Sequence, residues 1–290
     1  MKDIFSLNGK VALVTGGSRG IGAMIVQGFL EHGCSRVYIT ARKAAQCDAA
    51  AKELSMYGEC ISIPGDVSTQ EGIAALVAEI SKRESKLDIL VNNAGAAWGA
   101  EFDEFPESGW DKVVDLNMKT PFFLTQAFAP MLRLAAKQHM AKVINIASID
   151  GLSVNPWETY SYAASKAGVI HLTKRMSLEL IKDGICVNAI APGAFASEMN
   201  REARDHGDET AQNIPARRIG RDEDMAAAQT LGLLQRQTVQ FHWQNQAWPD
   251  FDTFLASLTQ EKRKKIRQER RRVTDAGVGF RWSLGAHISE

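Results

Sequence analysis

The sequence predicts an α/β fold, a doubly wound (Rossmann) parallel sheet with helices on both faces. Short apolar strand patterns alternate with helical patterns up to about residue 230, and a glycine-rich turn joins the first strand to the first helix. Residues just after each strand are therefore the candidate site, because ligands bind at the carboxyl ends of such strands. Strands are expected at 11–14, 37–40, 60–63, 88–91, 142–147 and 186–190. Helices are expected at 20–32, 44–57, 70–84, 107–137, 160–183 and 222–234.

The first strand leads into a glycine turn with G-x3-G-x-G spacing, formed by Gly16, Gly20 and Gly22. Glycine lets the chain turn tightly and lets a pyrophosphate approach the backbone, while the following helix offers free N–H groups. The spacing differs from G-x-G-x-x-G, so a glycine turn without ligand is the alternative for this motif alone. The expected cofactor contacts in this turn are Gly16, Ser18, Arg19, Gly20, Ile21 and Gly22.

The second strand ends where NAD-binding sites carry an acidic residue for the ribose 2′-hydroxyl. Here the chain reads Ala41-Arg42-Lys43 instead. A carboxylate would repel a 2′-phosphate, whereas Arg42 can hold one in a bidentate fork, with Arg19 closing on it from the glycine turn. A solvated Arg-Lys pair on a loop is the alternative. We therefore expect NADP(H) as the cofactor.

The composition is ordinary for a soluble globular protein, with 45% hydrophobic residues, 23% charged residues and a formal net charge of zero. No overall field therefore recruits nucleic acid or a membrane. The four cysteines lack C-x-x-C spacing, which indicates free thiols in a reducing compartment, and the six isolated histidines predict no metal site. Without a long apolar run or a signal-peptide core, a cytoplasmic protein with no membrane span is expected.

Tyr162 and Lys166 lie four residues apart in the predicted helix 160–183, so they share one face. A free tyrosine, with a pKa of about 10, exchanges protons poorly near neutrality. A nearby ammonium group lowers that pKa, so Lys166 is expected to make Tyr162 an effective acid–base catalyst. An ordinary exposed pair is the alternative. Tyr160 lacks this arrangement, because position 164 is alanine.

Further motifs follow the glycine turn along the chain. In order they are T-G-x3-G-x-G at 15–22, Asp66-Val67, Asn92-Asn93-Ala94-Gly95, Asn117, Ser148, Tyr162-x3-Lys166 and Pro192-Gly193. With these motifs in this order, the chain resembles the short-chain dehydrogenases/reductases over residues of about 5–228. Within that family it is most similar to NADPH-dependent β-ketoacyl reductases of the rhamnolipid-biosynthesis type, through F-S-L-x-G-K at 5–10, W-G-A at 98–100, S-G-W at 108–110 and I-P-A-R at 214–217.

The resemblance implies a role for each of four catalytic residues. Tyr162 would give a proton to a carbonyl oxygen as hydride arrives from the nicotinamide, and Lys166 would also hold the nicotinamide ribose. Ser148 would hydrogen-bond the substrate oxygen and steady the developing alkoxide. Asn117 would anchor a water in the proton relay. The further cofactor contacts that it implies are Asp66, Val67, Asn93, Gly95, Pro192 and Gly193.

Two tryptophans sit on predicted loops beside this site. Trp98 and Trp157 either line an apolar substrate pocket or simply pack against neighbouring loops. Simple packing is the more common role of a loop tryptophan.

The family pattern breaks near residue 232, because the usual last strand of the sheet never appears. Residues 233–290 instead alternate as β–α–β with a basic helix, and they resemble a fragment of a FemAB-like acyltransferase of the GNAT superfamily, through Q-F-H-W-x-N at 240–245 and the basic run 262–271. The expected domains are thus a reductase at 1–232 and an atypical appendage at 233–290, a fusion or truncation product. The segment 278–284 is expected to cover the open edge of the sheet, and a loosely attached β–α–β appendage is the alternative. A solvated face of the basic helix is favoured over a nucleic-acid or lipid surface.

The sequence thus predicts an NADPH-dependent carbonyl reductase for a 3-oxoacyl or similar small ketone, with homo-oligomerisation left open. A non-catalytic nucleotide-binding or interaction protein is the rival, because a replaced C-terminus could spoil the substrate pocket. All four catalytic residues are present, which favours the enzyme.

Overall fold

The computed structural model describes residues 6–195, 204–212, 218–221, 224, 256, 259–260 and 263–264. The chain divides into two compact units, Met1–Gln235 and Arg236–Glu290, and the sheet and its helices belong to the first. The predicted β–α–β appendage and the packing of 278–284 on the sheet lie outside the described residues. So does the predicted helix 222–234, apart from Asp224.

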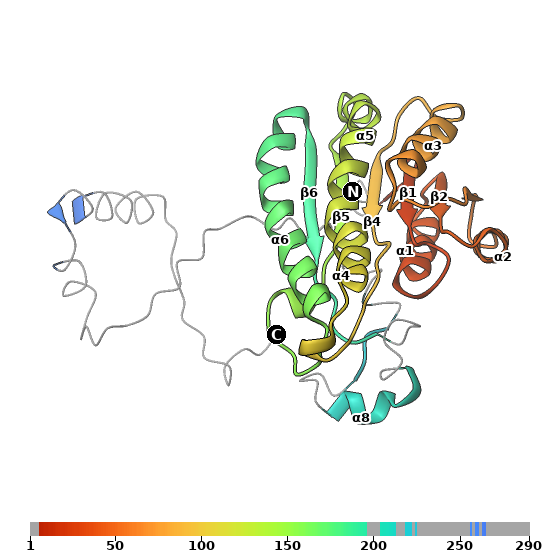
Figure 1. The fold of residues 1–290 in the computed structure, drawn as a ribbon. Coiled ribbons are helices and arrows are strands. Elements are labelled where there is room, and N and C mark those ends of the chain that lie inside the picture. Colours follow the sequence, from red (N-terminus) through yellow and green to blue (C-terminus); the bar gives the residue numbers. More distant parts are fainter. Residues whose placement is uncertain are drawn as a thin grey trace, which may run out of the picture. The chain divides into compact units, whose positions relative to one another are not determined.

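Six parallel strands form one sheet in the described part of the chain, in the order β3-β2-β1-β4-β5-β6 (Figure 1). The chain builds outward from β1 to β3 and then starts again at β4, on the other side of β1. This reversal leaves a crevice at the carboxyl ends of the central strands. The strands are β1 (Val11–Thr15), β2 (Arg36–Thr40), β3 (Cys60–Ser62), β4 (Ile89–Asn92), β5 (Ala141–Ile146) and β6 (Ile185–Ile190).

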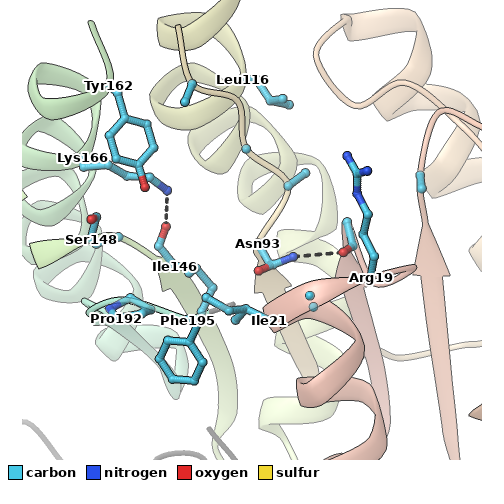
Figure 2. A pocket seen from close by; sticks show the side chains of 18 of the residues that line it. Arg19, Ile21, Asn93, Leu116, Ile146, Ser148, Tyr162, Lys166, Pro192 and Phe195 are labelled. Atoms are coloured by element: carbon cyan, nitrogen blue, oxygen red, sulfur yellow. Dashed lines mark hydrogen bonds between the residues drawn. The ribbon is translucent and has the colours of Figure 1, made fainter. Parts of the chain in front are cut away.

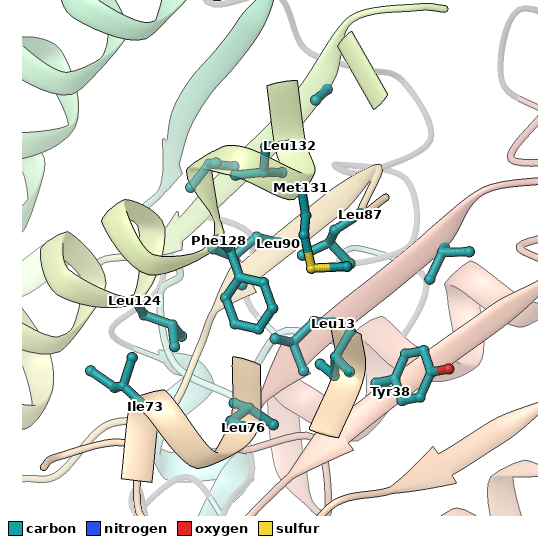
Figure 3. Close-up of a cluster of buried hydrophobic side chains, with 14 of the residues drawn as sticks. Leu13, Tyr38, Ile73, Leu76, Leu87, Leu90, Leu124, Phe128, Met131 and Leu132 are labelled. Atoms are coloured by element: carbon teal, nitrogen blue, oxygen red, sulfur yellow. The ribbon is translucent and has the colours of Figure 1, made fainter. Parts of the chain in front are cut away.

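Two hydrophobic clusters, one on each face, hold helices against the sheet. Because side chains alternate along a strand, Leu13 of β1 enters one cluster and Val14 enters the other. The first cluster joins the sheet to α3 and α5, with Phe128 fully buried in it (Figure 3), and the second joins it to α1 and α2. Burial of one such side chain contributes about 2–3 kcal/mol. The main helices are α1 (Gly20–Glu31), α2 (Ala44–Leu54), α3 (Gln70–Ser81), α4 (Glu107–Val114), α5 (Thr120–Ala136) and α6 (Tyr160–Leu180).

The strands are confirmed to within one or two residues, and the helix predicted at 107–137 is found at 107–136 with a π-helical turn inside it. A five-residue π-helical turn, η2 (Asp115–Lys119), separates α4 from α5. The backbone N–H of Thr120 donates to Asp115 O, five residues earlier, and Pro121 has no N–H to give to Asn117 O. The regular i→i−4 pattern is therefore interrupted beside a predicted catalytic residue.

The four cysteines are free thiols, as expected. Burial raises the pKa of Cys34 and that of Cys60 to about 12, which makes both thiols inert. No helix in the described residues has the length and apolarity to cross a membrane.

Candidate active site

A cavity of about 780 Å³ opens at the carboxyl ends of the strands. Loops that follow each of the six strands contribute to its wall, so residues far apart in sequence meet there. A volume of this size is typical of a site for a cofactor and a small substrate. Every predicted site residue except Asn117 lines it: Gly16, Ser18, Arg19, Gly20, Ile21, Gly22, Arg42, Asp66, Val67, Asn93, Gly95, Ser148, Tyr162, Lys166, Pro192 and Gly193.

The glycine turn requires glycine for geometric reasons. Gly16 and Gly20 have φ angles of 64° and 53°, a left-handed conformation that other residues rarely adopt. A Cβ on Gly22 would lie 2.1 Å from Gly16 O. The Asn93 amide Nδ2 donates to Thr15 O at 2.9 Å and to Gly16 O at 3.1 Å, which ties the end of β4 to the turn (Figure 2). The turn is thus fixed by backbone contacts that leave no room for a side chain.

Helix α1 begins at Gly20, inside the cavity wall, and its N-cap residue Arg19 makes no side-chain cap hydrogen bond. The first N–H groups of the helix and its positive dipole end are therefore available to an anionic group in the cavity. The Arg19 side chain itself lies beside the cavity, well separated from Tyr162 and Lys166 (Figure 2).

Polar groups gather at the end of the cavity beside β2. Arg42 and Lys43 line it, and so does Gln46 of the first turn of α2. Thr40, the last residue of β2, is only 1% exposed, and its Oγ1 has no hydrogen-bond partner in the described structure. Buried hydroxyl groups are usually hydrogen-bonded, so a bound ligand is a natural partner for Thr40 Oγ1. The positive charges of Arg42 and Lys43 beside it fit the ribose phosphate of NADP(H).

The opposite end of the cavity carries Ser148, Tyr162 and Lys166 (Figure 2). Ser148 follows β5, while the other two residues lie one turn apart on α6. Lys166 is only 5% exposed, and its Nζ donates to Ile146 O at 2.7 Å. The same Nζ lies 5.6 Å from the centre of the Tyr162 ring. A phenol, a hydroxyl and an ammonium group therefore meet around one part of the cavity.

Burial determines the proton affinities at this end. Burial lowers the pKa of Lys166 to about 8. Burial also raises the pKa of Tyr162; a hydrogen bond with Ser148 opposes this shift, and the charge of Asp150 adds to it. The expectation that Lys166 lowers the Tyr162 pKa is wrong for this structure. The ammonium group points to Ile146 O, and the loss of water around the phenol dominates.

Asn117 lies behind the cavity wall rather than in it. It sits in η2 and is 2% exposed. Its amide accepts from Ala96 N at 2.8 Å and donates to Ala96 O at 2.9 Å and to Ser165 Oγ at 3.1 Å. These bonds join the loop after β4 to α6 next to Lys166, so in this structure the side chain connects the two halves of the cavity wall.

Several other predicted residues have local partners. Asp66 Oδ1 accepts from Ser68 N at 3.0 Å and from Ser68 Oγ at 2.7 Å, in the loop that leads to α3. Trp98 packs against Gly109, with Lys112 Nζ 5.1 Å from its ring centre, and it is not part of the cavity wall. Trp157 does line the cavity. Simple packing is thus the role found for Trp98 alone.

Some cavity residues carried no motif and were not predicted. Thr40, Lys43 and Gln46 surround Arg42, so a search for polar neighbours of that arginine would have found them. Asp150 lies two residues after Ser148, and that proximity was its only signal. Phe195 has no signal in the sequence, because it reaches the wall through the loop after β6.

Two family models match the chain. The short chain dehydrogenase model matches residues 10–208. The FemAB-like model, whose description is peptidoglycan biosynthesis and recognition, matches residues 197–290. The two matches therefore overlap at 197–208. The second match includes the 233–290 segment in which that resemblance was expected.

Curated relatives are similar over about three quarters of the chain. The rhamnolipids biosynthesis 3-oxoacyl-[acyl-carrier-protein] reductase of Pseudomonas aeruginosa is 45% identical over 231 residues, which are 78% of this chain and 90% of that protein. The 3-oxoacyl-[acyl-carrier-protein] reductase FabG of Staphylococcus epidermidis is 36% identical over 219 residues, which are 75% and 88% of the two chains.

Solved structures agree with this assignment. The Pseudomonas aeruginosa RhlG/NADP active-site complex matches with a TM-score of 0.76 and 44% identity, over 79% of this chain and 91% of that one. A gluconate 5-dehydrogenase from Burkholderia cenocepacia, in complex with NADP and tartrate, matches with a TM-score of 0.72 and 31% identity, over 79% and 89% of the two chains. The chain therefore belongs to the short chain dehydrogenase family.

Proposed function

We propose that the protein is an NADP(H)-dependent carbonyl reductase that acts on a 3-oxoacyl compound or a similar ketone. One observation carries the proposal: a single cavity has Ser148, Tyr162 and Lys166 at one end and Arg19 and Arg42 at the other. The two ends follow strands β5 and β2, which are three strand spacings apart, or about 14 Å. An extended dinucleotide can bridge that distance. The 45% identical relative named for 3-oxoacyl reduction supports the substrate class.

The cavity residues fit NADP(H) in a consistent order. The glycine turn and the N-terminus of α1 would hold the pyrophosphate, and Arg19 and Arg42 the 2′-phosphate. Asp66 and Val67 would lie at the adenine, and Asn93 and Gly95 along the middle of the cofactor. Pro192 and Gly193 would border the nicotinamide. When bound, the cofactor supplies the hydride.

The end of the cavity that carries Ser148, Tyr162 and Lys166, which we call the carbonyl end, would then carry out the proton transfer. Tyr162 Oη gives its proton to the carbonyl oxygen. In the cofactor-free structure burial raises the pKa of Tyr162, so the phenol is protonated near neutrality but is a weaker acid than a free tyrosine. Ser148 Oγ hydrogen-bonds the same oxygen as negative charge develops on it. Lys166 holds the nicotinamide ribose. Asn117 supports a water of the proton relay, through its position between Ala96 and Ser165.

The domain organisation supports the enzyme rather than the non-catalytic rival. We propose a reductase domain at 1–232, which contains every proposed catalytic residue, followed by an atypical segment at 233–290. The boundary between the two compact units, at Gln235 and Arg236, supports that division. The cytoplasm is the proposed compartment, because the four cysteines are free thiols.

The test is NADPH oxidation by the full-length protein with a panel of ketones, from 3-oxoacyl thioesters and esters to simple cyclic ketones. Turnover with 3-oxoacyl compounds, together with a measurable Kd for NADPH, is the expected result. Tight NADPH binding without turnover of any ketone would favour the non-catalytic nucleotide-binding protein. A lack of NADPH binding would contradict both functions.

A further inference from the structure

Asp150 lies at the carbonyl end of the cavity, two residues after Ser148, which is proposed to bind the substrate oxygen. It lines the same cavity as Ser148, Tyr162 and Lys166. It sits in a short helical turn, η3 (Ile149–Gly151), whose N-cap is Ser148. The Asp150 backbone N–H donates to Ser148 Oγ at 3.1 Å. The two residues therefore keep a fixed relative position.

The Asp150 carboxylate has no counter-ion in the described part of the chain. The titratable groups around Tyr162 are Lys166 on α6 and Asp150 on η3, and the Lys166 ammonium is committed to Ile146 O. Arg19 and Arg42 belong to the far end of the cavity. Burial is the largest cause of the raised pKa of Tyr162, and the negative charge of Asp150 adds to it, so the field of Asp150 reaches the phenol.

The wall around Asp150 offers little else to an anion. Its chain neighbour Ile149 is 45% exposed and Trp157 is 61% exposed, and both line the cavity. An apolar chain can lie against these side chains, whereas a carboxylate would lose water there and meet a like charge.

We propose that Asp150 is a specificity-determining residue that acts as a charge filter: it disfavours ketones with a carboxylate near the carbonyl and leaves uncharged 3-oxoacyl esters and thioesters as the substrate class. The inference rests on the proposed function. Two like charges about 6 Å apart change binding about threefold at the dielectric constant of water and about a hundredfold at an effective value of 20. A site at a cavity mouth lies between these limits, so about a tenfold effect is expected.

The test compares one substrate with and without its charge. Reduction of 3-oxobutanoate and of its ethyl ester is measured as kcat/KM with the NADPH complex of the full chain. The unmutated enzyme should prefer the ester by at least about tenfold, and Asp150→Asn should remove most of that preference by raising kcat/KM for the carboxylate. Asp150→Glu should restore the preference. Asp103→Asn, a change at an exposed residue outside the cavity wall, should leave it unaltered.

Ionic strength provides a second test. Added salt should reduce the preference for the ester over the carboxylate in the unmutated enzyme and should not change it in Asp150→Asn. The same ester-to-carboxylate ratio in both proteins would overturn the proposal.

The effect of the Asp150 charge can also be measured without a ketone, through the pKa of Tyr162. The phenolate absorbance of the four tyrosines is followed against pH, and Tyr162→Phe identifies the signal of Tyr162. Asp150→Asn should lower the pKa of Tyr162, because a charge that raises it is removed. An unchanged pKa would reject the filter. If no variant reduces either ketone, the proposed function fails, while this titration still decides whether the Asp150 charge acts at the carbonyl end.

Discussion

The two ends of the cavity are built from different parts of the polypeptide. The glycine end is the part of the cavity formed by the turn from Gly16 to Gly22. There, glycines in the left-handed conformation and the N-terminus of α1 expose backbone groups to the cavity, and a Cβ on Gly22 would collide with Gly16 O. At the carbonyl end, the chemistry belongs to side chains, chiefly Tyr162 and Lys166, held on one regular helix. The first end therefore depends on empty space, and the second depends on functional groups.

This difference predicts two kinds of failure. An added methyl group at the glycine end should damage folding and cofactor binding together. Removal of the Tyr162 hydroxyl group at the carbonyl end should abolish chemistry while the fold and the cofactor affinity survive. Four substitutions, taken from the largest expected effect to the smallest, test that distinction.

Tyr162→Phe should reduce kcat by about 10³-fold, because it deletes the proton donor and little else. The Kd of NADPH should stay within a few-fold of the unmutated value, as measured by fluorescence titration. Tyr160→Phe is the matched control: Tyr160 packs against Phe102 and Phe105, outside the cavity wall, and should retain normal turnover. Substantial activity in Tyr162→Phe would refute the mechanism.

Gly22→Ala should weaken NADPH binding by about a hundredfold and destabilise the protein by about 2–3 kcal/mol, because the new Cβ would lie 2.1 Å from Gly16 O. Gly99→Ala is the control, since a Cβ there would meet no atom closer than 3.6 Å and Gly99 lies outside the cavity wall. Calorimetric titration and thermal unfolding measure both effects. Equal behaviour of the two variants would show that the glycine end tolerates side chains.

Lys166→Met should stabilise the cofactor-free protein at pH 7 by about 3 kcal/mol while abolishing turnover. Burial lowers the Lys166 pKa from 10.5 to about 8, so below pH 8 the folded state carries a buried charge that the unfolded state solvates. That penalty shrinks as pH rises from about 8 and is absent above 10.5, where both states are neutral.

Thermal unfolding against pH measures the Lys166 effect. The stability gain of Lys166→Met over the unmutated protein should be largest below pH 8 and disappear toward pH 10.5. Lys174→Met, at an exposed position on the same helix, should show no such trend. A gain that does not vary with pH would have a cause other than the buried charge.

Arg42→Asp should change cofactor choice and little else. The unmutated protein should bind NADPH at least about tenfold more tightly than NADH, equivalent to about 1.4 kcal/mol, and the variant should lose or reverse that ratio. Lys52→Asp makes the same change of charge at an exposed position of α2 outside the cavity wall and should keep the ratio. Equal affinity of the unmutated protein for both nucleotides would remove the assigned role of Arg42.

The sequence by itself determined where the strands lie and which functional residues follow each of them. Apolar runs and helical periodicity predicted β1 to β6 closely, and the spacing of Tyr162 and Lys166 predicted a shared helix face. These are local properties: backbone geometry converts a spacing of two or four residues directly into a direction. The glycine turn was equally readable, because only glycine fits where the backbone must come close to a ligand.

Only the tertiary structure decided what those groups experience. The Lys166 amine found its acceptor at Ile146, twenty residues away in sequence, and burial raised the Tyr162 pKa where the isolated pair predicted a fall. Asn117 was placed behind the wall by contacts with Ala96 and Ser165. Proton affinity and hydrogen-bond partners depend on which distant segments exclude water from a group, and no local pattern encodes that.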